Sequence, residues 1–450
     1  MTSVAKLRGL LRSLKGVATL QTTIEVVGWI LFAIWAVVSG VPTVWMFGRS
    51  LKRQSDRLPD PPSWPRVSVV VPARDEGHKI EAGLKSLLAS DYPDFEVIAI
   101  DDRSRDDTGA IMDRLANEVP LPLGEGGRRP DEGFVGGSCG EAESSVSCVP
   151  HPGPLPKGEG EKDQQPRLRV IHITDLPEGW LGKNHALQVG ATQATGEWLL
   201  FSDGDVIHDP QTLRRAVRFA VTHGVDHLPL FPDIEAGGLL EAAFVACFGL
   251  IFAAGTQPYL IPTRWPRAYC GVGAYNLVCR SALERAGGFE PIKLDILDDV
   301  KLGKMLKRTG SRGSVLRAGD GLSIRWQSGA WACVTGLEKN AFASANYSVW
   351  QLLWICGVTS LVFCGPAVGA VLAGEAGTGF VAAAVLSHFL YGLNAWLFGH
   401  SFWLFPMLMP SGLAFVFAFL RSGWITLRQG GVRWRDTFYP LEVLRQGVFR

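Results

Sequence analysis

The sequence has no excess of charge of either sign. Its 450 residues include 44 Lys and Arg against 43 Asp and Glu, which gives a formal net charge of +1. Proteins that bind nucleic acids usually present a basic face or stripe, so this balance argues against a nucleic acid as a partner. The eight cysteines form no Cys-x-x-Cys pair and no Cys/His cluster at zinc spacing. We therefore expect the cysteines to be reduced and structural.

Long apolar runs, by contrast, lie near both ends of the chain. Residues 24–47, IEVVGWILFAIWAVVSGVPTVWMF, are long enough to cross a bilayer core of about 30 Å and longer than the apolar part of a signal peptide. They predict a transmembrane anchor. Residues 1–23 predict a basic amphipathic segment on a membrane surface, and a solvated, frayed terminus is the alternative. Three further runs within residues 350–420 predict transmembrane helices, and residues 421–450 form a basic C-terminal tail.

Between these runs, residues 64–345 alternate strand-like and helix-like patterns. RVSVVVPA and FEVIAIDD are short β-branched runs that end in Pro or Asp, and the segment between them has helical apolar spacing. This alternation predicts an α/β domain, in which ligands bind at the carboxyl ends of parallel strands. Residues 120–166 do not fit the pattern, because they are rich in Gly, Pro, Glu and Ser and have no apolar periodicity. We expect them to be a disordered insertion.

Five motifs together resemble family 2 glycosyltransferases with a GT-A fold. In chain order they are VSVVVPARDE, IAIDDRSRDDTG, GWLGKNHALQVG, LLFSDGDVIHDP and LDILDDVKLGKMLKRTG. Each motif alone is a weak signal, but the set in this order is specific. RWQSGAWACVTGLEKNAF and WRDTFYP are similar to the membrane-anchored branch associated with hopanoid and carotenoid pathways. The resemblance implies inverting transfer of a sugar from a nucleotide sugar, expected to be a UDP-sugar, to a lipid-like acceptor.

The resemblance also implies where the nucleotide sugar binds. The expected residues are Pro72, Ala73, Arg74, Asp75 and Glu76 after the first strand, and Asp101 and Asp102 at the end of the second. Asp75 stands where the family often has Asn, which replaces an amide with a group that only accepts hydrogen bonds. Lys183 lies just before a predicted helix and could pair with a phosphate, although a surface lysine is the alternative.

The run LLFSDGDVIHDP ends a predicted strand with two aspartates, Asp203 and Asp205. A carboxylate left unpaired in a buried place would cost several kcal/mol. The departing diphosphate of a nucleotide sugar needs electrostatic stabilisation, and hard divalent cations prefer oxygen ligands. We therefore expect Asp203 and Asp205 to bind Mg²⁺ or Mn²⁺, with Asp203 also close to the nucleotide sugar. His208 could be a further ligand, but a histidine of the loop is the favoured interpretation.

An inverting transferase also needs a base that takes the proton of the acceptor hydroxyl. LDILDDVKLG offers Asp298 and Asp299 where the family motif is usually Glu-Asp with the second residue as base. We therefore expect Asp299 to be the base and Asp298 its neighbour in the catalytic site. The alternative for Asp298 is a simple helix N-cap.

A further apolar run over 239–262 is nearly long enough to span a membrane. One crossing there would put Asp205 and Asp299 on opposite sides, so we expect an interfacial or buried helix near the acceptor entrance. Because the domain is expected to use nucleotide sugars, we expect it to lie in the cytoplasm, on the inner (plasma) membrane. Three later crossings would leave the arginine-rich tail outside the cell, against the usual preference for Lys and Arg on the cytoplasmic side. Either one run is therefore re-entrant or the count of crossings is wrong.

Three other functions fit parts of the sequence. A processive polysaccharide synthase would share the core but carries Gln-x-x-Arg-Trp, and here Leu322 stands at the Gln position ahead of Arg325 and Trp326. A non-catalytic scaffold that binds lipid or nucleotide is disfavoured by the intact acidic set. A transporter is weaker still, because the later apolar runs contain few ionisable residues.

Overall fold

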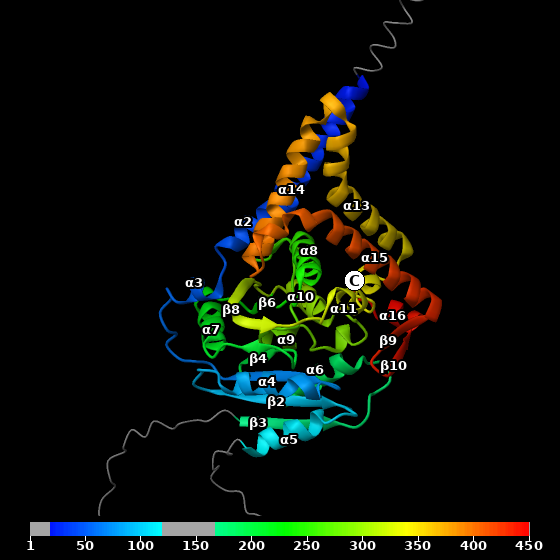
Figure 1. Ribbon diagram of the computed structural model, residues 1–450. Coiled ribbons are helices and arrows are strands. Elements are labelled where there is room, and N and C mark those ends of the chain that lie inside the picture. Colours follow the sequence, from blue (N-terminus) through cyan, green and yellow to red (C-terminus); the bar gives the residue numbers. More distant parts are fainter. Residues whose placement is uncertain (1–18, 119–166, 450) are drawn as a thin grey trace, which may run out of the picture.

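The computed structural model describes residues 19–118 and 167–449. The predicted amphipathic segment, except for its last five residues, and all of the predicted insertion lie outside the described residues. In Figure 1 a sheet-bearing domain lies beneath a tapering group of long helices. Of the described cysteines, all six are free, as expected for reduced thiols.

An eight-stranded mixed sheet forms the centre of the domain, in the order β3-β2-β1-β4-β7-β6-β8-β5. The strands are β1 (Val67–Ala73), β2 (Phe95–Asp102), β3 (Arg167–Ile173), β4 (Trp198–Phe201), β5 (Ile207–His208), β6 (His227–Ile234), β7 (Asn276–Cys279) and β8 (Leu316–Ile324). The first four strands in sheet order run parallel, and β7 pairs antiparallel with both β4 and β6. The predicted α/β class is confirmed, with β1, β2 and β4 ending at one edge.

The sheet is buried on both faces, which explains the continuous apolar character of its strands. Val69 and Val71 face one core cluster, with α4, α5 and α7, whereas Val70 faces the other, with α6, α9 and α10. These helices are α4 (Gly77–Leu88), α5 (Thr108–Glu118), α6 (Gly182–Gln193), α7 (Thr212–His223), α9 (Arg280–Arg285) and α10 (Asp298–Arg308). Because strand side chains alternate between the faces, one β-branched run serves both cores.

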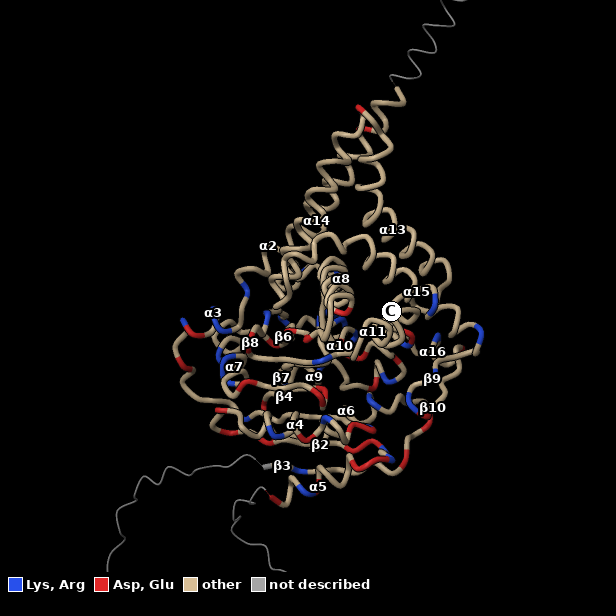
Figure 2. The backbone as a smooth tube through the Cα atoms, viewed as in Figure 1, with Lys and Arg blue, Asp and Glu red and all other residues tan. Residues whose placement is uncertain are grey.

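Five helices are long and apolar enough to cross a membrane, by length and composition, among the described residues. They cover Thr19–Phe47, Leu239–Leu260, Val349–Leu372, Gly374–Leu397 and Phe402–Gln429. Figure 2 shows almost no charged residues along α13 and α14, whereas Asp, Glu, Lys and Arg crowd the sheet-bearing domain. This division is what a protein partly immersed in lipid requires.

The remaining helices are those of this apolar group and those that connect it to the sheet. They are the π-helical η1 (Trp35–Gly40), α2 (Val41–Phe47), α3 (Leu51–Ser55), α8 (Leu239–Thr256), α11 (Ala330–Gly336), α12 (Ala341–Ser344), α13 (Val349–Leu372), α14 (Thr378–Leu397), α15 (Leu408–Gln429) and α16 (Leu441–Gln446). Short 3₁₀ turns are η2 (Pro258–Leu260), η3 (Glu290–Ile292), η4 (Gly374–Gly377) and η5 (Phe402–Met407). The apolar run over 239–262 forms α8 and η2, and buried residues of α8 pack with those of α11 to α15 in one cluster.

The C-terminal segment differs from the basic tail that the sequence predicts. Residues 421–429 continue α15, and β9 (Gly431–Trp434) and β10 (Thr437–Pro440) form a hairpin. The Tyr439 hydroxyl accepts a hydrogen bond from the Gly182 amide at 3.2 Å, at the start of α6. The segment therefore docks on the sheet-bearing domain.

Candidate active site

The carboxyl ends of β1, β2 and β4 open into a polar cavity of about 250 Å³. Its lining includes most of the residues predicted to bind the nucleotide sugar or metal: Pro72, Ala73, Arg74, Glu76, Asp102, Lys183, Asp203 and Asp205. The other lining residues are Gly182, Ile324, Trp326, Gln327, Lys339, Trp434, Arg435 and Tyr439. The first set comes from strand ends and the start of α6, as expected for a parallel sheet.

Asp75 shapes the wall of this cavity instead of lining it. Its backbone is left-handed, with φ at 53°, and its carboxylate accepts a hydrogen bond from the Arg105 amide at 2.8 Å. Asp tolerates this conformation better than most residues. An acceptor-only side chain therefore suits this position, because the partner is a backbone donor.

Asp101 is the predicted binding residue that the structure does not bring to the cavity. Its carboxylate accepts from the Ser104 amide at 3.1 Å and contacts His172 Nδ1 at 2.9 Å. Asp102, the next residue of β2, lies at the cavity and pairs with Arg103 at 2.8 Å. Two neighbouring residues of a strand point to opposite faces, so of these two only Asp102 lines the cavity.

The aspartates that follow β4 both form ion pairs with lysines. Asp203 lies 2.8 Å from Lys183 Nζ, and Asp205 lies 2.9 Å from Lys79 Nζ. Both carboxylates line the polar cavity, where they are available to a ligand.

Glu76 adds a third carboxylate to this region. Burial, together with the nearby charges of Asp203 and Asp205, raises the pKa of Glu76 to about 7. Its Oε2 atom is buried and has no hydrogen-bond partner. Asp203 and Asp205 therefore lie close enough to Glu76 to disfavour its ionisation, and a bound cation would relieve this repulsion.

The carboxylate ligands available here fit a divalent cation whose coordination shell is completed by the substrate. Within residues 19–118 and 167–449, no group of three or more His, Cys, Asp or Glu side chains could hold a metal ion. Mg²⁺ is commonly bound by one or two carboxylates together with substrate phosphates and water. Asp203 and Asp205 could hold such a cation once a diphosphate is present.

His208 lies away from this set. It forms part of β5, is 5% exposed, and its Nε2 lies 3.1 Å from the Ser202 hydroxyl. Burial lowers its pKa to about 3. His208 is thus a neutral histidine held inside the domain, which supports a structural role and argues against a role as a metal ligand.

Asp298 and Asp299 begin α10 and lie at the rear of the site. Lys183 Nζ is 3.3 Å from Asp298, so one lysine links Asp298 to Asp203. Asp299 accepts hydrogen bonds from the amides of Gly273 at 2.9 Å and Val300 at 2.7 Å. Burial and the neighbouring Asp298 raise the pKa of Asp299 to about 7. A carboxylate in this range can accept a proton near neutral pH.

The loop before β7 brings Asp299 close to Asp203. Gly273 accepts a hydrogen bond from the Asp203 amide at 3.1 Å while its own amide donates to Asp299. A Cβ on Gly273 would lie 2.7 Å from Asp203 Oδ2, so any larger residue there would displace the Asp203 carboxylate. Sequence reasoning missed Gly273, because its partners Asp203 and Asp299 lie about 70 and 26 positions away in the chain.

A second cavity, of about 300 Å³, adjoins the catalytic carboxylates. Asp298, Asp299, Lys183 and Asp203 lie on its lining. The rest is mainly apolar and comes from β6, α8 and the membrane-type helices, including Phe231, Val245, Phe248, Phe252, Phe398 and Trp326. Trp326 stacks on Phe248 with ring centroids 4.9 Å apart, and it borders both cavities.

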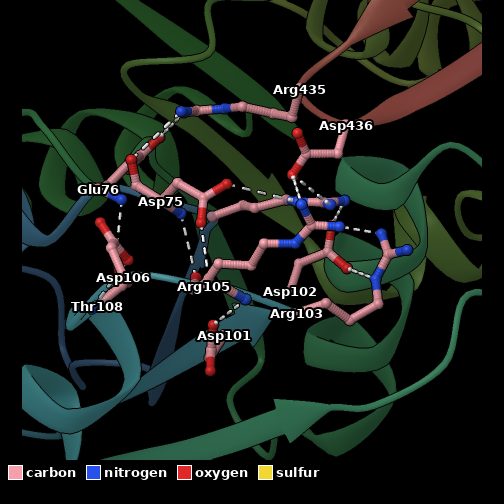
Figure 3. A network of polar contacts seen from close by, with 12 residues as sticks. Asp75, Glu76, Asp101, Asp102, Arg103, Arg105, Asp106, Thr108, Arg435 and Asp436 are labelled. Carbon is pink, nitrogen blue, oxygen red and sulfur yellow. Dashed lines mark hydrogen bonds and ion pairs between the residues drawn. The ribbon is translucent and has the colours of Figure 1, made fainter.

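The turn between β9 and β10 contacts residues beside the polar cavity, as Figure 3 shows for Arg435 and Asp436. Arg435 Nη2 lies 3.2 Å from Glu76, and Asp436 pairs with Arg105 at 3.1 Å and Arg74 at 3.8 Å. Arg435 takes a left-handed backbone at the turn, with φ at 53°. These contacts are partly exposed, so each pair adds little stability, but together they fix the hairpin against the donor site.

A family comparison decides the identity of the domain. Residues 68–126 and 161–285 match the model of glycosyl transferase family 2. The domain that these residues form is a family 2 glycosyltransferase domain. The order of its strands and the acidic residues at their ends agree with the GT-A fold of this family. No curated protein matches the chain.

Solved structures similar to this glycosyltransferase include three transferases. A mannosyltransferase from Pyrobaculum calidifontis, in complex with GDP-Man and Mn²⁺, is 18% identical over 89% of this chain and 99% of that one, with a TM-score of 0.46. S. aureus TarS 1-349, with UDP-GlcNAc, is 16% identical over 83% and 96%, with a TM-score of 0.36. Glucosyl-3-phosphoglycerate synthase from Mycobacterium tuberculosis, with Mn²⁺ and UDP, is 18% identical over 68% and 83%, with a TM-score of 0.35.

Proposed function

We propose that this glycosyltransferase moves one sugar, with inversion, from a nucleotide sugar to the hydroxyl or carboxyl group of a lipid-like acceptor. The donor occupies the polar cavity, with a UDP-sugar as the expected donor. The acceptor is a hydrophobic molecule such as a hopanoid, a carotenoid or a related lipid. Catalysis takes place where the two cavities meet.

The observation that carries this proposal is the apolar cavity beside Asp299. A soluble acceptor such as a sugar or a small acid would need several polar partners, whereas the lining here is mainly aromatic and aliphatic. The α8 and α14 helices contribute Phe248 and Asn394 to the same lining. A lipid could pass from the bilayer between such helices while its polar end reaches the carboxylates.

The chemistry proposed for the site uses Asp299 as the base. The acceptor oxygen forms a bond to the anomeric carbon, its proton passes to an oxygen of Asp299, and the sugar–phosphate bond breaks with its electrons on the diphosphate. Hydrogen bonds from Gly273 and Val300 orient the carboxylate for this step. Lys183, between Asp298 and Asp203, keeps positive charge near the reacting centre.

Asp203 and Asp205 would hold Mg²⁺ or Mn²⁺ together with the donor's diphosphate. Bound there, the cation supplies positive charge to the leaving group. The lysines that now pair with both aspartates would then be released to contact phosphate oxygens or water.

We further propose that the protein is a multi-pass protein of the cell's inner (plasma) membrane, with its catalytic domain in the cytoplasm, where nucleotide sugars are made. Docking of the β9–β10 hairpin on the catalytic domain supports an even number of crossings after residue 345. The α13–α14 pair can supply two crossings. In Figure 1 α15 turns away from this pair and runs beside the domain toward β9, which favours an interfacial position for α15.

A processive polysaccharide synthase is the second candidate, and one residue argues against it. Leu322, at the position of the motif glutamine, is 1% exposed and packs in the core around the sheet. It cannot reach a polymer or a donor. The neighbouring Trp326 instead packs on Phe248 of α8.

The proposal is tested with membranes that contain the protein and a panel of radiolabelled nucleotide sugars. Label should enter the organic phase after lipid extraction with one donor, and membranes carrying the Asp299→Asn variant should give little signal. Label recovered only in a high-molecular-weight, water-soluble polymer would instead support the processive synthase. Label in neither product with any donor would contradict a catalytic role.

Filling the apolar cavity should impair use of the acceptor alone. Gly249 lies on the cavity lining in α8, and a Cβ there would have as its nearest neighbour Asn394 Nδ2 at 3.9 Å. Gly249→Leu therefore has room to fold but occupies space that the lipid needs, and we expect the acceptor KM to rise about tenfold or more. An added isobutyl group excludes several carbons of ligand, each worth about 0.8 kcal/mol when buried.

The matched control is Gly255→Leu, on the same helix, where a Cβ would meet nothing within 4 Å. Calorimetric affinity for the nucleotide sugar should be unchanged in both variants. Equal acceptor KM values in Gly249→Leu and Gly255→Leu would show that the acceptor binds elsewhere.

A further inference from the structure

Lys339 lies where the donor cavity and the apolar cavity meet. It belongs to the turn between α11 and α12, and it lines both cavities. Its ammonium group lies 4.0 Å from the centre of the Trp434 ring in the β9–β10 hairpin. A lysine from the segment before the membrane helices is thus held by an aromatic residue from the segment after them.

The charge of Lys339 has no carboxylate partner among the described residues. The other basic residues of the donor cavity all have one: Lys183 pairs with Asp203 and Asp298, Arg435 with Glu76, and Arg74 with Asp75, Asp102 and Asp436. Lys339 has only the face of Trp434. An ammonium that is largely removed from water without a counter-ion is costly, so such a residue is expected where an anionic ligand supplies the missing charge.

The surroundings also keep Lys339 ready to bind an anion. Burial and the charge of Lys183 lower its pKa to about 8, while Asp298 and Asp203 act in the opposite direction. The group therefore remains mostly protonated at neutral pH, and an arriving anion would raise its pKa. The Trp434 ring holds the ammonium through a cation–π contact without neutralising it.

We propose that Lys339 is a catalytic residue that binds phosphate oxygens of the donor's diphosphate. It contacts the leaving group as the sugar–phosphate bond breaks and negative charge grows on the diphosphate. Trp434 acts as a positioning residue, because it holds the lysine side chain toward the cavity. The proposal rests on the donor site described above and is independent of the identity of the acceptor.

The test measures binding of nucleotides to the full-length protein in detergent with Mn²⁺. Calorimetry with UDP and GDP, and with UMP and GMP, separates the second phosphate from the rest of the nucleotide. UDP or GDP, whichever the wild type binds, should bind to Lys339→Met about tenfold or more weakly, which is the usual loss for a charge-assisted contact. Binding of the matching monophosphate should change less than about twofold. Lys339→Arg keeps the charge and should recover most of the affinity.

Lys85→Met is the matched control, because Lys85 lies on the surface of α4 and pairs with Glu81. If Lys339→Met fails to fold, Trp434→Leu gives a second route, since it releases the lysine without burying a new group.

Unchanged diphosphate affinity with a raised acceptor KM would show that the phosphate belongs to the lipid, and would overturn the assignment to the donor. Unchanged values of both would exclude a role for Lys339 in binding phosphate. The nucleotide affinities do not depend on knowing the acceptor, so failure of this proposal differs from failure of the proposed function.

Discussion

Replacement of Asp299 by Asn should lower the rate of sugar transfer about 10²–10⁴-fold while leaving donor affinity nearly unchanged. The amide keeps the size of the carboxylate but cannot take a proton at neutral pH. The two carboxylate oxygens accept from Gly273 and Val300, so one of these hydrogen bonds is lost and some destabilisation is expected. Initial rates of transfer to lipid and calorimetric donor affinity, both in detergent, measure the two effects.

The pH profile gives an independent readout of the same residue. Because the pKa of Asp299 is raised to about 7, its basic form disappears as the pH falls through that value. The wild-type rate should therefore drop below about pH 7, and the residual rate of Asp299→Asn should lack this limb. A near-native rate in the variant would place the base elsewhere, with Asp298 as the next candidate.

Loss of Asp205, or removal of divalent cations, should abolish transfer and also weaken donor binding. Asp205 contacts Lys79, and both side chains are partly exposed, at 20% and 37%, so Asp205→Ala should cost little folding stability. The expected result is a melting temperature within a few degrees of the wild type, because a loss of about 1 kcal/mol shifts it by about 2–4 °C in a chain of this size. Donor affinity should fall, unlike in Asp299→Asn.

Asp91→Ala is a suitable control, since Asp91 is exposed on the surface and pairs only with Arg214 among the described residues. Its activity should match the wild type. For the wild-type protein, transfer should stop in excess chelator and return when Mg²⁺ or Mn²⁺ is restored. Full activity in chelator would contradict the role given to Asp203 and Asp205.

Much of the donor site could be predicted because it follows from local patterns. β-branched runs that end in Asp or Pro mark where strands stop, and parallel strands bring those ends to one edge. Asp102, Asp203 and Asp205 meet there for this reason. The alternation of side chains along β2 would also have separated Asp101 from Asp102, and the sequence interpretation did not apply it.

The other side of the site could not be predicted residue by residue. Lys339, Trp434 and Arg435 reach the cavity only because the chain returns from the membrane-type helices to the catalytic domain. No spacing in the sequence encodes that return. The motifs RWQSGAWACVTGLEKNAF and WRDTFYP singled out the two segments that carry these residues as similar to one branch of the family. Which of their side chains face the cavity depends on tertiary packing.

The late position of the β9–β10 hairpin has a consequence for biosynthesis. The first wall of the donor pocket, at residues 72–76, leaves the ribosome more than 350 residues before Arg435. Between the two lie all the apolar helices after the catalytic domain, which must find their place before the hairpin can dock on Glu76 and Arg105. The nascent chain therefore cannot complete the lining of this cavity until those helices are in position, and we expect sugar transfer to begin only after they have packed.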